Sequence, residues 1–485
     1  MLEYTSQVKK KGRVSLSTTN QKFSLIDDQR SPWMTIILLA WPIFIEQILN
    51  SLAQAVDTAM VGSLGAIATA SVSISQSPNM LVNGVIMALG VGFTSMIARS
   101  VGANDMERAR GLVRQAILTI FSLGIPATIV MFSLARYIPI WMGGAPEILD
   151  TAQTYNQIFS ISMMFRCMTM VLTSIYRGYG DSKTPMKVNI SINVLNVIGN
   201  FLMIFPTREL TVFGVTFTMF GFGWGVAGAA AATSLSAILG SMVLLSRCFT
   251  VKTEMRISLK DSFKPDWNEL KIVVKLGIPA MIQRFCMSSA SIIVTSTIAS
   301  LGTVAVASQS LAGTAESLSF MPGFAFGTAV TTLFGQSLGA QREDMAQDYL
   351  KKTLQLGSLV MAFMTCVLFF GSTFIMNIFT PDPEVIRHGS VLLKILALIQ
   401  IPQMITFCLN GAMQGAGDTK SPLISTMVSL WCVRVLGVTL AVRVFGMGLY
   451  SVCVAMCSDN CVRCILSYAF YKKGAWKKGA KLTAK

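Results

Sequence analysis

The segment Gly178-Tyr-Gly-Asp-Ser-Lys-Thr-Pro185 recurs 237 residues later as Gly415-Ala-Gly-Asp-Thr-Lys-Ser-Pro422. Other matching positions keep the same spacing: Pro42 with Pro279, Leu64-Gly65 with Leu301-Gly302, and Ser100, Gly102 and Ala103 with Ser337, Gly339 and Ala340. Self-similarity at a fixed spacing indicates an internal duplication. We therefore expect a chain built from two copies of one structural unit.

The spacing changes near the end of the first copy. Gly225 and Gly228 correspond best to Gly448 and Ser451, which lie 223 residues further along the chain. The first copy therefore carries about 14 residues that the second copy lacks. We expect these extra residues in an outer loop near residues 207–221.

The composition restricts the class of protein. Of the 485 residues, 53% are hydrophobic and only 13% are charged. Soluble domains carry about 25% charged residues and disordered chains have low hydrophobicity, so both classes are excluded. Apolar stretches of about 20 residues are long enough to cross a bilayer as helices. Twelve such stretches lie at residues 33–57, 70–98, 112–134, 155–175, 188–206, 222–246, 272–298, 310–337, 353–379, 390–412, 423–443 and 447–471.

Six helices per copy place both copies in the membrane in the same orientation, because an even number of crossings returns the chain to its starting side. We predict an all-α membrane protein with 12 transmembrane helices, in two parallel six-helix pseudo-repeat lobes around a central cleft. The expected divisions are a basic cytosolic tail (1–31), a first lobe with helices 1–6 (32–246), a cytosolic linker (247–271), a second lobe with helices 7–12 (272–471) and a basic cytosolic tail (472–485).

The formal net charge of +16 has a topological explanation. With the N-terminus inside, 30 of the 39 Lys and Arg residues fall in inner segments, 5 fall in outer segments and 4 lie within helices. This bias follows the positive-inside rule and places both termini in the cytosol, in a multi-pass protein of the plasma (inner) membrane. A nucleic-acid partner is therefore not needed to explain the charge, and we expect none.

Metal and cofactor chemistry is not indicated by the residue pattern. Cys453, Cys457, Cys461 and Cys464 share one face of the last apolar helix, but no histidine lies near them, so we interpret them as packing residues. The single histidine, His388, argues against a histidine-built metal site or proton relay. The chain has no Walker loop and no nucleophile–base pattern, so we predict neither ATP-driven transport nor an enzyme.

Two acidic residues, Glu46 and Asp57, lie within the first apolar helix. Ionisable groups inside a membrane are costly and are functional candidates by default. The two are 11 residues apart, which is about three helical turns and roughly 16 Å, so they share one helix face. The alternative is that each carboxylate only satisfies neighbouring polar groups.

The fifth apolar helix carries a stripe of asparagines, formed by Asn189, Asn193, Asn196 and Asn200. Amides on one helix face would lack partners in lipid, so the stripe must face another helix or a wet cavity. Amide oxygens beside the Asp57 carboxylate would make an oxygen-only site for Na⁺, or would tune Asp57 for proton coupling. Hydrogen bonding that only joins helices remains the alternative.

Several motifs in order resemble the multidrug and toxic compound extrusion (MATE) transporters, a family of the MOP-type exporter superfamily. The resemblance covers residues 33–477. The residues that carry it, besides the paired octapeptides, are Pro42, Ala55-Val-Asp-Thr-Ala-Met-Val-Gly62, Phe320-Met-Pro-Gly-Phe-Ala-Phe-Gly-Thr-Ala329, Gly335-Gln-Ser-Leu-Gly-Ala340, Gly446-Met-Gly-Leu449, Asp459, Arg463 and Gly474-Ala-Trp476.

This resemblance implies a secondary active antiporter that exports cationic or amphipathic organic compounds in exchange for H⁺ or Na⁺. Its partners would be small organic substrates and the lipid bilayer, its only cofactor the coupling ion, and its functional unit a monomer. Asp57 matches the aspartate of the family's first helix, Asn196 and Asn200 match an Asn-x-x-x-Asn form of helix 5, and Thr233 aligns with a further ligand. The resemblance thus implies an ion-coupling site at these four residues.

The second copy departs from the family pattern. Some members carry a glutamate in helix 7 and an aspartate in helix 10, whereas this chain has Gln283 and Met287 in helix 7 and no acid in residues 390–412. The first lobe is therefore the better place for the coupling ion.

Other polar residues inside helices have weaker assignments. Glu46, Asn193, Gln283 and Glu316 are candidates for the substrate cleft, and Glu316 either faces a cationic substrate or pairs with Arg284. Asp459 and Arg463 are spaced i, i+4 and are expected to form a structural ion pair. The repeated octapeptides are expected as cytosolic turns, because glycine permits the bend and proline begins the next helix, with a gating role as the alternative.

Two further functions compete with the exporter. A flippase for lipid-linked oligosaccharides should present a cluster of basic residues in its cleft, but the intramembrane arginines of this chain are scattered. A membrane scaffold or receptor that transports nothing would have no reason to pair a helix-1 acid with an asparagine stripe.

Overall fold

The computed structural model describes residues 31–212, 215–250, 255–258 and 260–483. The first lobe consists of α2 (Pro32–Gly62), α3 (Ala66–Gly102), α4 (Met106–Leu134), α5 (Ile138–Trp141), α6 (Pro146–Ile161), α7 (Met163–Tyr179), α8 (Lys183–Met203), β1 (Pro206–Val212), β2 (Val215–Phe222) and α9 (Gly225–Thr250). The second lobe consists of α10 (Trp267–Ala299), α11 (Thr303–Ser319), α12 (Met321–Gly339), α13 (Glu343–Phe379), α14 (Pro383–Ala397), α15 (Gln400–Gly415), α16 (Lys420–Met427), η1 (Val428–Val435), α17 (Leu436–Thr439), η2 (Leu440–Val444), α18 (Leu449–Lys472) and α19 (Ala475–Thr483).

These elements form the twelve expected spans. Within the described residues, seven helices are long and apolar enough to cross a membrane, and three bent pairs bring the number to ten. The more polar helices α8 and α10 pack along α2 and α3 and complete six spans in each lobe. The spans predicted at 155–175, 310–337 and 390–412 are each formed by two helices, with bends of 48°, 43° and 47° between them.

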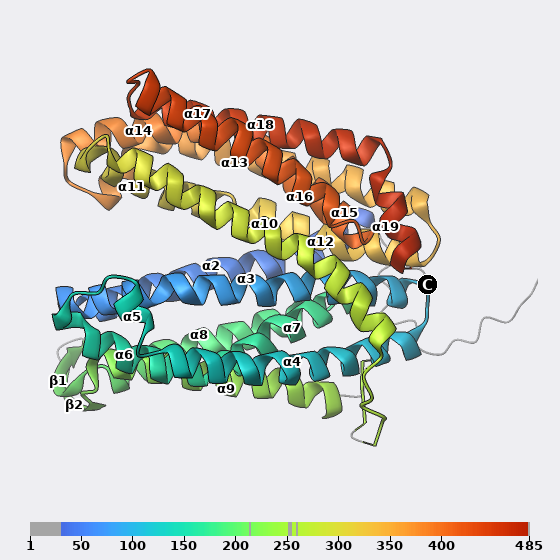
Figure 1. Ribbon diagram of the computed structural model, residues 1–485, viewed down its shortest axis with the longest axis horizontal. Coiled ribbons are helices and arrows are strands. Elements are labelled where there is room, and N and C mark those ends of the chain that lie inside the picture. The colour runs from blue at the N-terminus through green and yellow to red at the C-terminus, as the bar shows by residue number, and fades with distance from the viewer. Residues whose placement is uncertain (1–30, 213–214, 251–254, 259, 484–485) are drawn as a thin grey trace, which may run out of the picture.

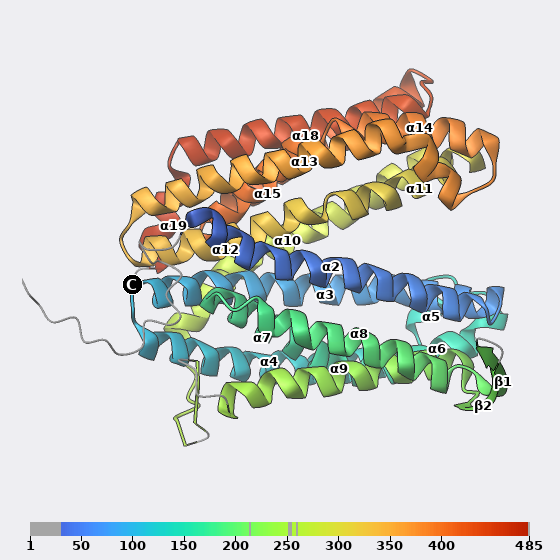
Figure 2. The same ribbon diagram turned by 180° about the vertical axis from the view of Figure 1, so that it is seen from behind.

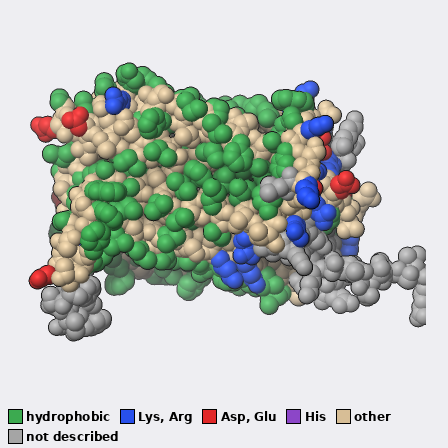
Figure 3. All heavy atoms as spheres, turned by 90° about the horizontal axis from the view of Figure 1, so that it is seen from below, with side chains coloured by type: hydrophobic (Ala, Val, Ile, Leu, Met, Phe, Trp, Pro, Cys, Tyr) green, Lys and Arg blue, Asp and Glu red, His purple; other side chains and the backbone are tan. Residues whose placement is uncertain are grey.

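The two lobes touch at one end of the molecule and diverge toward the other (Figures 1 and 2). We call the diverging end, which carries β1, β2 and α5, the hairpin end. We call the opposite end, where α3 and α12 terminate and α19 lies, the basic end. Figure 3 shows a hydrophobic surface between the two ends, with Lys and Arg gathered at the basic end. A broad apolar belt of this kind is the surface that a bilayer covers.

Each lobe inserts the start of its first helix into the core of the other lobe. Ile36 and Leu39 of α2 are buried in a cluster with residues of α12, α13 and α15. At the equivalent repeat positions, Val273 and Leu276 of α10 are buried in the core of the first lobe. This exchange at the basic end follows the pseudo-two-fold symmetry that the duplication predicts.

Two glycines at equivalent repeat positions let α3 and α12 cross with their backbones in contact. A Cβ atom at Gly102 would lie 1.9 Å from the carbonyl oxygen of Gln336, and one at Gly339 would lie 2.1 Å from the carbonyl oxygen of Arg99. Only glycine fits at such a distance. We call this crossing, together with the hydrogen bonds around it, the inter-lobe seam.

The hydrogen bonds of the seam end on the repeated octapeptides and the residue that precedes the first of them. Ser95 of α3 donates to the carbonyl oxygen of Gly415 at 3.3 Å. The equivalent residue of α12, Thr332, donates to the carbonyl oxygen of Arg177 at 3.0 Å, and Gln336 donates to that of Gly178 at 3.0 Å. The octapeptides were expected as cytosolic turns, with a gating role as the alternative, and the structure adds that they join the two lobes.

The extra residues of the first copy form a β-hairpin rather than an irregular loop. Strands β1 and β2 pair antiparallel, with Arg208 opposite Met219. The hairpin occupies the predicted position near 207–221, but its strands were not part of the all-α expectation. Alternating Thr, Val and Phe residues in β2 favour a strand, although the segment is too short to distinguish from a loop by pattern alone.

The segment expected as a C-terminal tail contains helix α19. Trp476 is 3% exposed and packs against Phe334 and Tyr471 of the second lobe, with ring centroids 5.3 and 6.1 Å away. Arg99 of the first lobe donates to the carbonyl oxygen of Ala480 at 2.5 Å. Helix α19 therefore contacts both lobes at the basic end.

Candidate functional site

Helices α2 and α8 are joined by three side-chain hydrogen bonds at one constant sequence separation. Asn189 bonds to Glu46, Asn193 to Asn50 and Asn200 to Asp57, and each pair is 143 residues apart. A constant separation means that the two helices run in the same direction, side by side. We call these three contacts the polar ladder.

Asp57 lies at the rung of the ladder nearest the hairpin end. The amide of Asn200 donates to the carboxylate of Asp57 and lies 3.5 Å from Oδ1 of Asn196. The amide of Asn196 donates in turn to Oγ1 of Thr233 on α9, at 2.9 Å. The four residues expected at the ion-coupling site are therefore contiguous in the structure.

Burial makes this cluster chemically unusual. Asn200 is fully buried, and its Oδ1 atom has no hydrogen-bond partner in the part of the chain that the structure describes. No ion pair reaches Asp57 within those residues. A buried acceptor without a donor and a carboxylate without a cation are both costly, so the cluster is suited to a bound cation. Its ligands would all be oxygens, as hard cations prefer.

The second lobe has no equivalent cluster. The repeat places Val294 at the position of Asp57, Val433 at that of Asn196, Gly437 at that of Asn200 and Met456 at that of Thr233. These side chains offer no oxygen ligand. The oxygen cluster is therefore present in the first lobe and not at the equivalent positions of the second. The described residues contain no group of three or more His, Cys, Asp or Glu residues that would hold a metal ion.

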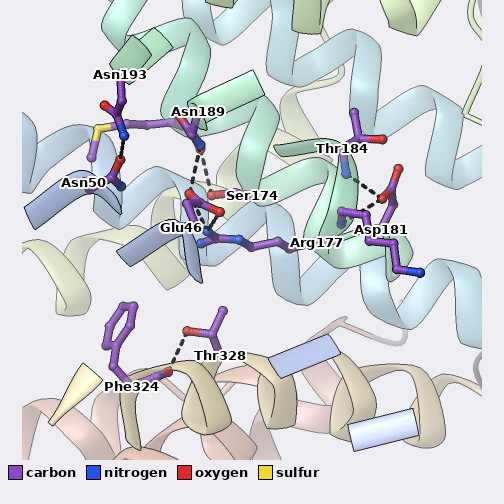
Figure 4. A network of polar contacts seen from close by, with 12 residues as sticks. Glu46, Asn50, Ser174, Arg177, Asp181, Thr184, Asn189, Asn193, Phe324 and Thr328 are labelled. Atoms are coloured by element: carbon purple, nitrogen blue, oxygen red, sulfur yellow. Dashed lines mark hydrogen bonds and ion pairs between the residues drawn. The ribbon is translucent and has the colours of Figure 1, made fainter. Parts of the chain in front are cut away.

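Glu46 lies at the opposite end of the polar ladder and is neutralised. Its two carboxylate oxygens each accept from Nη2 of Arg177 at 2.9 Å, and Oε1 also accepts from Asn189 at 2.8 Å (Figure 4). Glu46 is only 5% exposed. Arg177 was missed as a site residue, because its place beside the octapeptide led us to count it among the topological charges.

The cleft candidates of the second lobe have partners of their own. Gln283 donates to Oγ1 of Thr426 at 2.8 Å. Glu316 lies close enough to Arg434 to interact with its charge. Among the described residues, no ion pair forms between Glu316 and Arg284, which was one of the two alternatives.

Asp459 forms the most buried ion-pair cluster of the second lobe. It is fully buried and accepts from Arg463 and from Arg434, both at 2.7 Å. Arg463 also donates to Ser429 at 3.1 Å. The pair of Asp459 with Arg463 is therefore part of a larger cluster that ties α18 to the π-helical segment η1.

Asp459→Asn is expected to lower the free energy of unfolding by about 3–5 kcal/mol, because it leaves two partly buried guanidinium groups without a counterion. Thermal unfolding of the purified protein measures this. The matched control is Asp348→Asn, which breaks the more exposed i, i+4 pair with Lys352 and should cost about 0.3–0.5 kcal/mol. Equal melting temperatures for the two variants would contradict a structural role for the Asp459 cluster.

Known proteins resemble this chain over most of its length. The family model MatE matches residues 42–202 and 279–440, one match in each lobe. A probable multidrug resistance protein NorM of Thermotoga maritima is 31% identical over 450 residues, which cover 92% of this chain and 94% of the relative. The uncharacterized transporter YisQ of Bacillus subtilis is 25% identical over 91% of this chain and 94% of its own.

Solved structures show the same fold. An outward-facing multidrug resistance MATE transporter of the MOP superfamily superposes with a TM-score of 0.84 at 23% identity, over 95% of this chain and 99% of that one. A MOP superfamily transporter from Pyrococcus furiosus gives 0.83 at 22% identity, with the same coverage. With the duplicated match of the family model and the similarity to NorM, these findings show that the chain belongs to the MatE family of membrane transporters.

Proposed function

We propose that the protein is a secondary active antiporter that exports cationic or amphipathic organic compounds in exchange for inward H⁺ or Na⁺. The observation that carries the coupling is the cluster of Asp57, Asn196, Asn200 and Thr233. Among the described residues, its Asn200 Oδ1 atom has no hydrogen-bond donor and its Asp57 carboxylate has no ion-pair partner. Family membership and the names of the NorM relatives support the export of drug-like compounds.

The positive-inside rule gives the proposed orientation. The basic end faces the cytosol and the hairpin end faces outward, in the plasma (inner) membrane, with both termini in the cytosol. In this orientation the lobes meet at the cytosolic end and diverge toward the outside (Figure 1). The conformation is therefore the one in which a coupling ion reaches Asp57 and an exported compound leaves.

Coupling follows from the cost of a buried charge. Asp57 can remain ionised while the lobes are apart at the hairpin end, but its closure into an apolar interior requires a cation or a proton. The lobes therefore open at the cytosolic end only when the ion is bound at Asp57. They return to the outward-facing arrangement when an organic cation has taken the place of the ion. Asn193, Gln283 and Glu316 are our candidates for contact with that compound between the lobes.

Gradient-driven uptake into inverted membrane vesicles tests the function. A fluorescent organic cation should accumulate inside the vesicles when an outward-directed driving gradient of the coupling ion is imposed, and should stay at the background level without one. Separate H⁺ and Na⁺ gradients, each abolished by its own ionophore, identify the ion. Accumulation in neither case would contradict coupled export of the compounds tested.

A further inference from the structure

The end of the polar ladder nearest the basic end carries the ion pair of Glu46 with Arg177, which is not part of the cluster around Asp57. We propose that Arg177 neutralises Glu46 while the basic end is closed and leaves it when that end opens. Glu46 then becomes a second binding site for the coupling cation. The inference rests on the proposed function, because it describes the route by which the coupling ion leaves Asp57 for the cytosol.

Arg177 takes part in two sets of contacts, one within the first lobe and one with the second lobe. Its guanidinium binds both oxygens of Glu46 inside the first lobe, at 2.9 Å each. Its carbonyl oxygen accepts from Thr332 of the second lobe at 3.0 Å, and the next residue, Gly178, accepts from Gln336. Separation of the lobes at the basic end must break both backbone contacts, so it removes two of the hydrogen bonds that fix the end of α7 where Arg177 lies.

The second lobe shows that packing does not require these charges. The repeat places Gln283 at the position of Glu46, Thr426 at that of Asn189 and Gln414 at that of Arg177. Gln283 and Thr426 keep the hydrogen bond, again between residues 143 apart. The same helix contact thus forms from neutral groups, whereas a buried ion pair contributes little net stability over neutral packing. The charges in the first lobe therefore indicate a role beyond packing.

The polar ladder supplies a path between the two carboxylates. Asp57 and Glu46 are 11 residues apart, or roughly 16 Å along α2. The contact of Asn193 with Asn50, 2.7 Å long, lies between them and places amide groups along the way (Figure 4). A cation leaving Asp57 toward the basic end thus passes oxygen atoms before it reaches Glu46.

The order of events follows from charge balance. In the outward-open state Arg177 neutralises Glu46, and the ion binds at Asp57. When the seam opens, Arg177 is freed toward the cytosol, and the uncompensated Glu46 attracts the ion inward. As the seam begins to close, Arg177 returns to Glu46 and displaces the ion into the cytosol before the basic end is shut. Arg177 is therefore a positioning residue that makes ion release depend on lobe closure.

Four variants test this order by ion-driven uptake into inverted vesicles. Arg177→Gln leaves Glu46 without its counterion and should lower driven uptake about tenfold or more. Arg177→Lys keeps the charge, so it should recover most of the activity despite losing the guanidinium geometry. The double variant Glu46→Gln/Arg177→Gln reproduces the neutral pattern of the second lobe and should exceed Arg177→Gln alone by about fivefold or more. Gln414→Ala, at the equivalent repeat position, is the control and should stay near the wild-type rate.

A purely structural Arg177 would give a different pattern. In that case the double variant would restore driven uptake to the wild-type rate, because a neutral glutamine packs at the equivalent position of the second lobe, and this result overturns the inference. The proposed switch instead keeps uptake by the double variant below the wild-type rate, because no carboxylate remains to receive the ion. If Arg177→Gln fails to fold, the double variant still decides, because Gln283 shows that a neutral glutamine packs at the position of Glu46 in the second lobe. Failure of the proposed function is distinct, since it would appear in the wild-type protein as the absence of ion-driven uptake.

Discussion

Asp57→Asn is expected to abolish ion-driven transport in a protein that remains folded. Asparagine has the shape of aspartate and can still accept the hydrogen bond from Asn200, so the contact between α2 and α8 persists. The negative charge is lost, however. Unit charges 4 Å apart attract by about 4 kcal/mol at an effective dielectric constant of about 20, so cation affinity should fall by roughly 100-fold or more.

Uptake into inverted vesicles measures this loss, and thermal unfolding of the same preparation shows that the fold is kept. Asp344→Asn is the matched control, because this aspartate has a side chain that is 76% exposed at the basic end. The control should transport at the wild-type rate. Full coupled transport by Asp57→Asn would place the ion site elsewhere and would leave the MatE assignment untouched.

Much of the fold could be predicted, because both decisive signals are local in sequence. Apolar stretches of membrane-spanning length predicted the twelve spans, and the repeated octapeptides predicted two lobes of equal topology. The bend at Phe320 had a sequence signal that our prediction did not use, because Pro322 stands in the first turn of α12. The bend at Ser162 had none of this kind, since no proline begins α7.

The site was predictable to the extent that polar residues inside a membrane must find partners. The asparagine stripe had to face a helix or a cavity, and it faces α2 and α9. The constant separation of 143 residues was visible only after the two helices were known to lie side by side. Arg177 was hidden for a different reason, since its charge agrees with the positive-inside rule and so seemed already explained.

The inter-lobe seam gives the remaining large effect, from Gly102→Ala. The new methyl group would lie 1.9 Å from the carbonyl oxygen of Gln336, far inside contact distance, and backbone atoms of a helix cannot move aside as a flexible side chain does. Alanine normally stabilises a helix relative to glycine by about 1 kcal/mol, so the helix itself favours the substitution and the clash alone opposes it. The lobes should therefore fail to close at the basic end.

Hydrogen–deuterium exchange in lipid nanodiscs should detect this opening as faster exchange in the last turns of α3 and α12 and in both repeated turns. Ion-driven uptake should fall about tenfold or more, because a transporter held open at one end cannot complete its cycle. Gly313→Ala is the matched control, since a Cβ atom at that helical glycine meets nothing within 4 Å. Unchanged exchange at the seam in Gly102→Ala would mean that α3 and α12 need not touch for the basic end to close. We expect Gly339→Ala to give the same exchange pattern as Gly102→Ala, because the two glycines occupy equivalent repeat positions in the same crossing of α3 and α12.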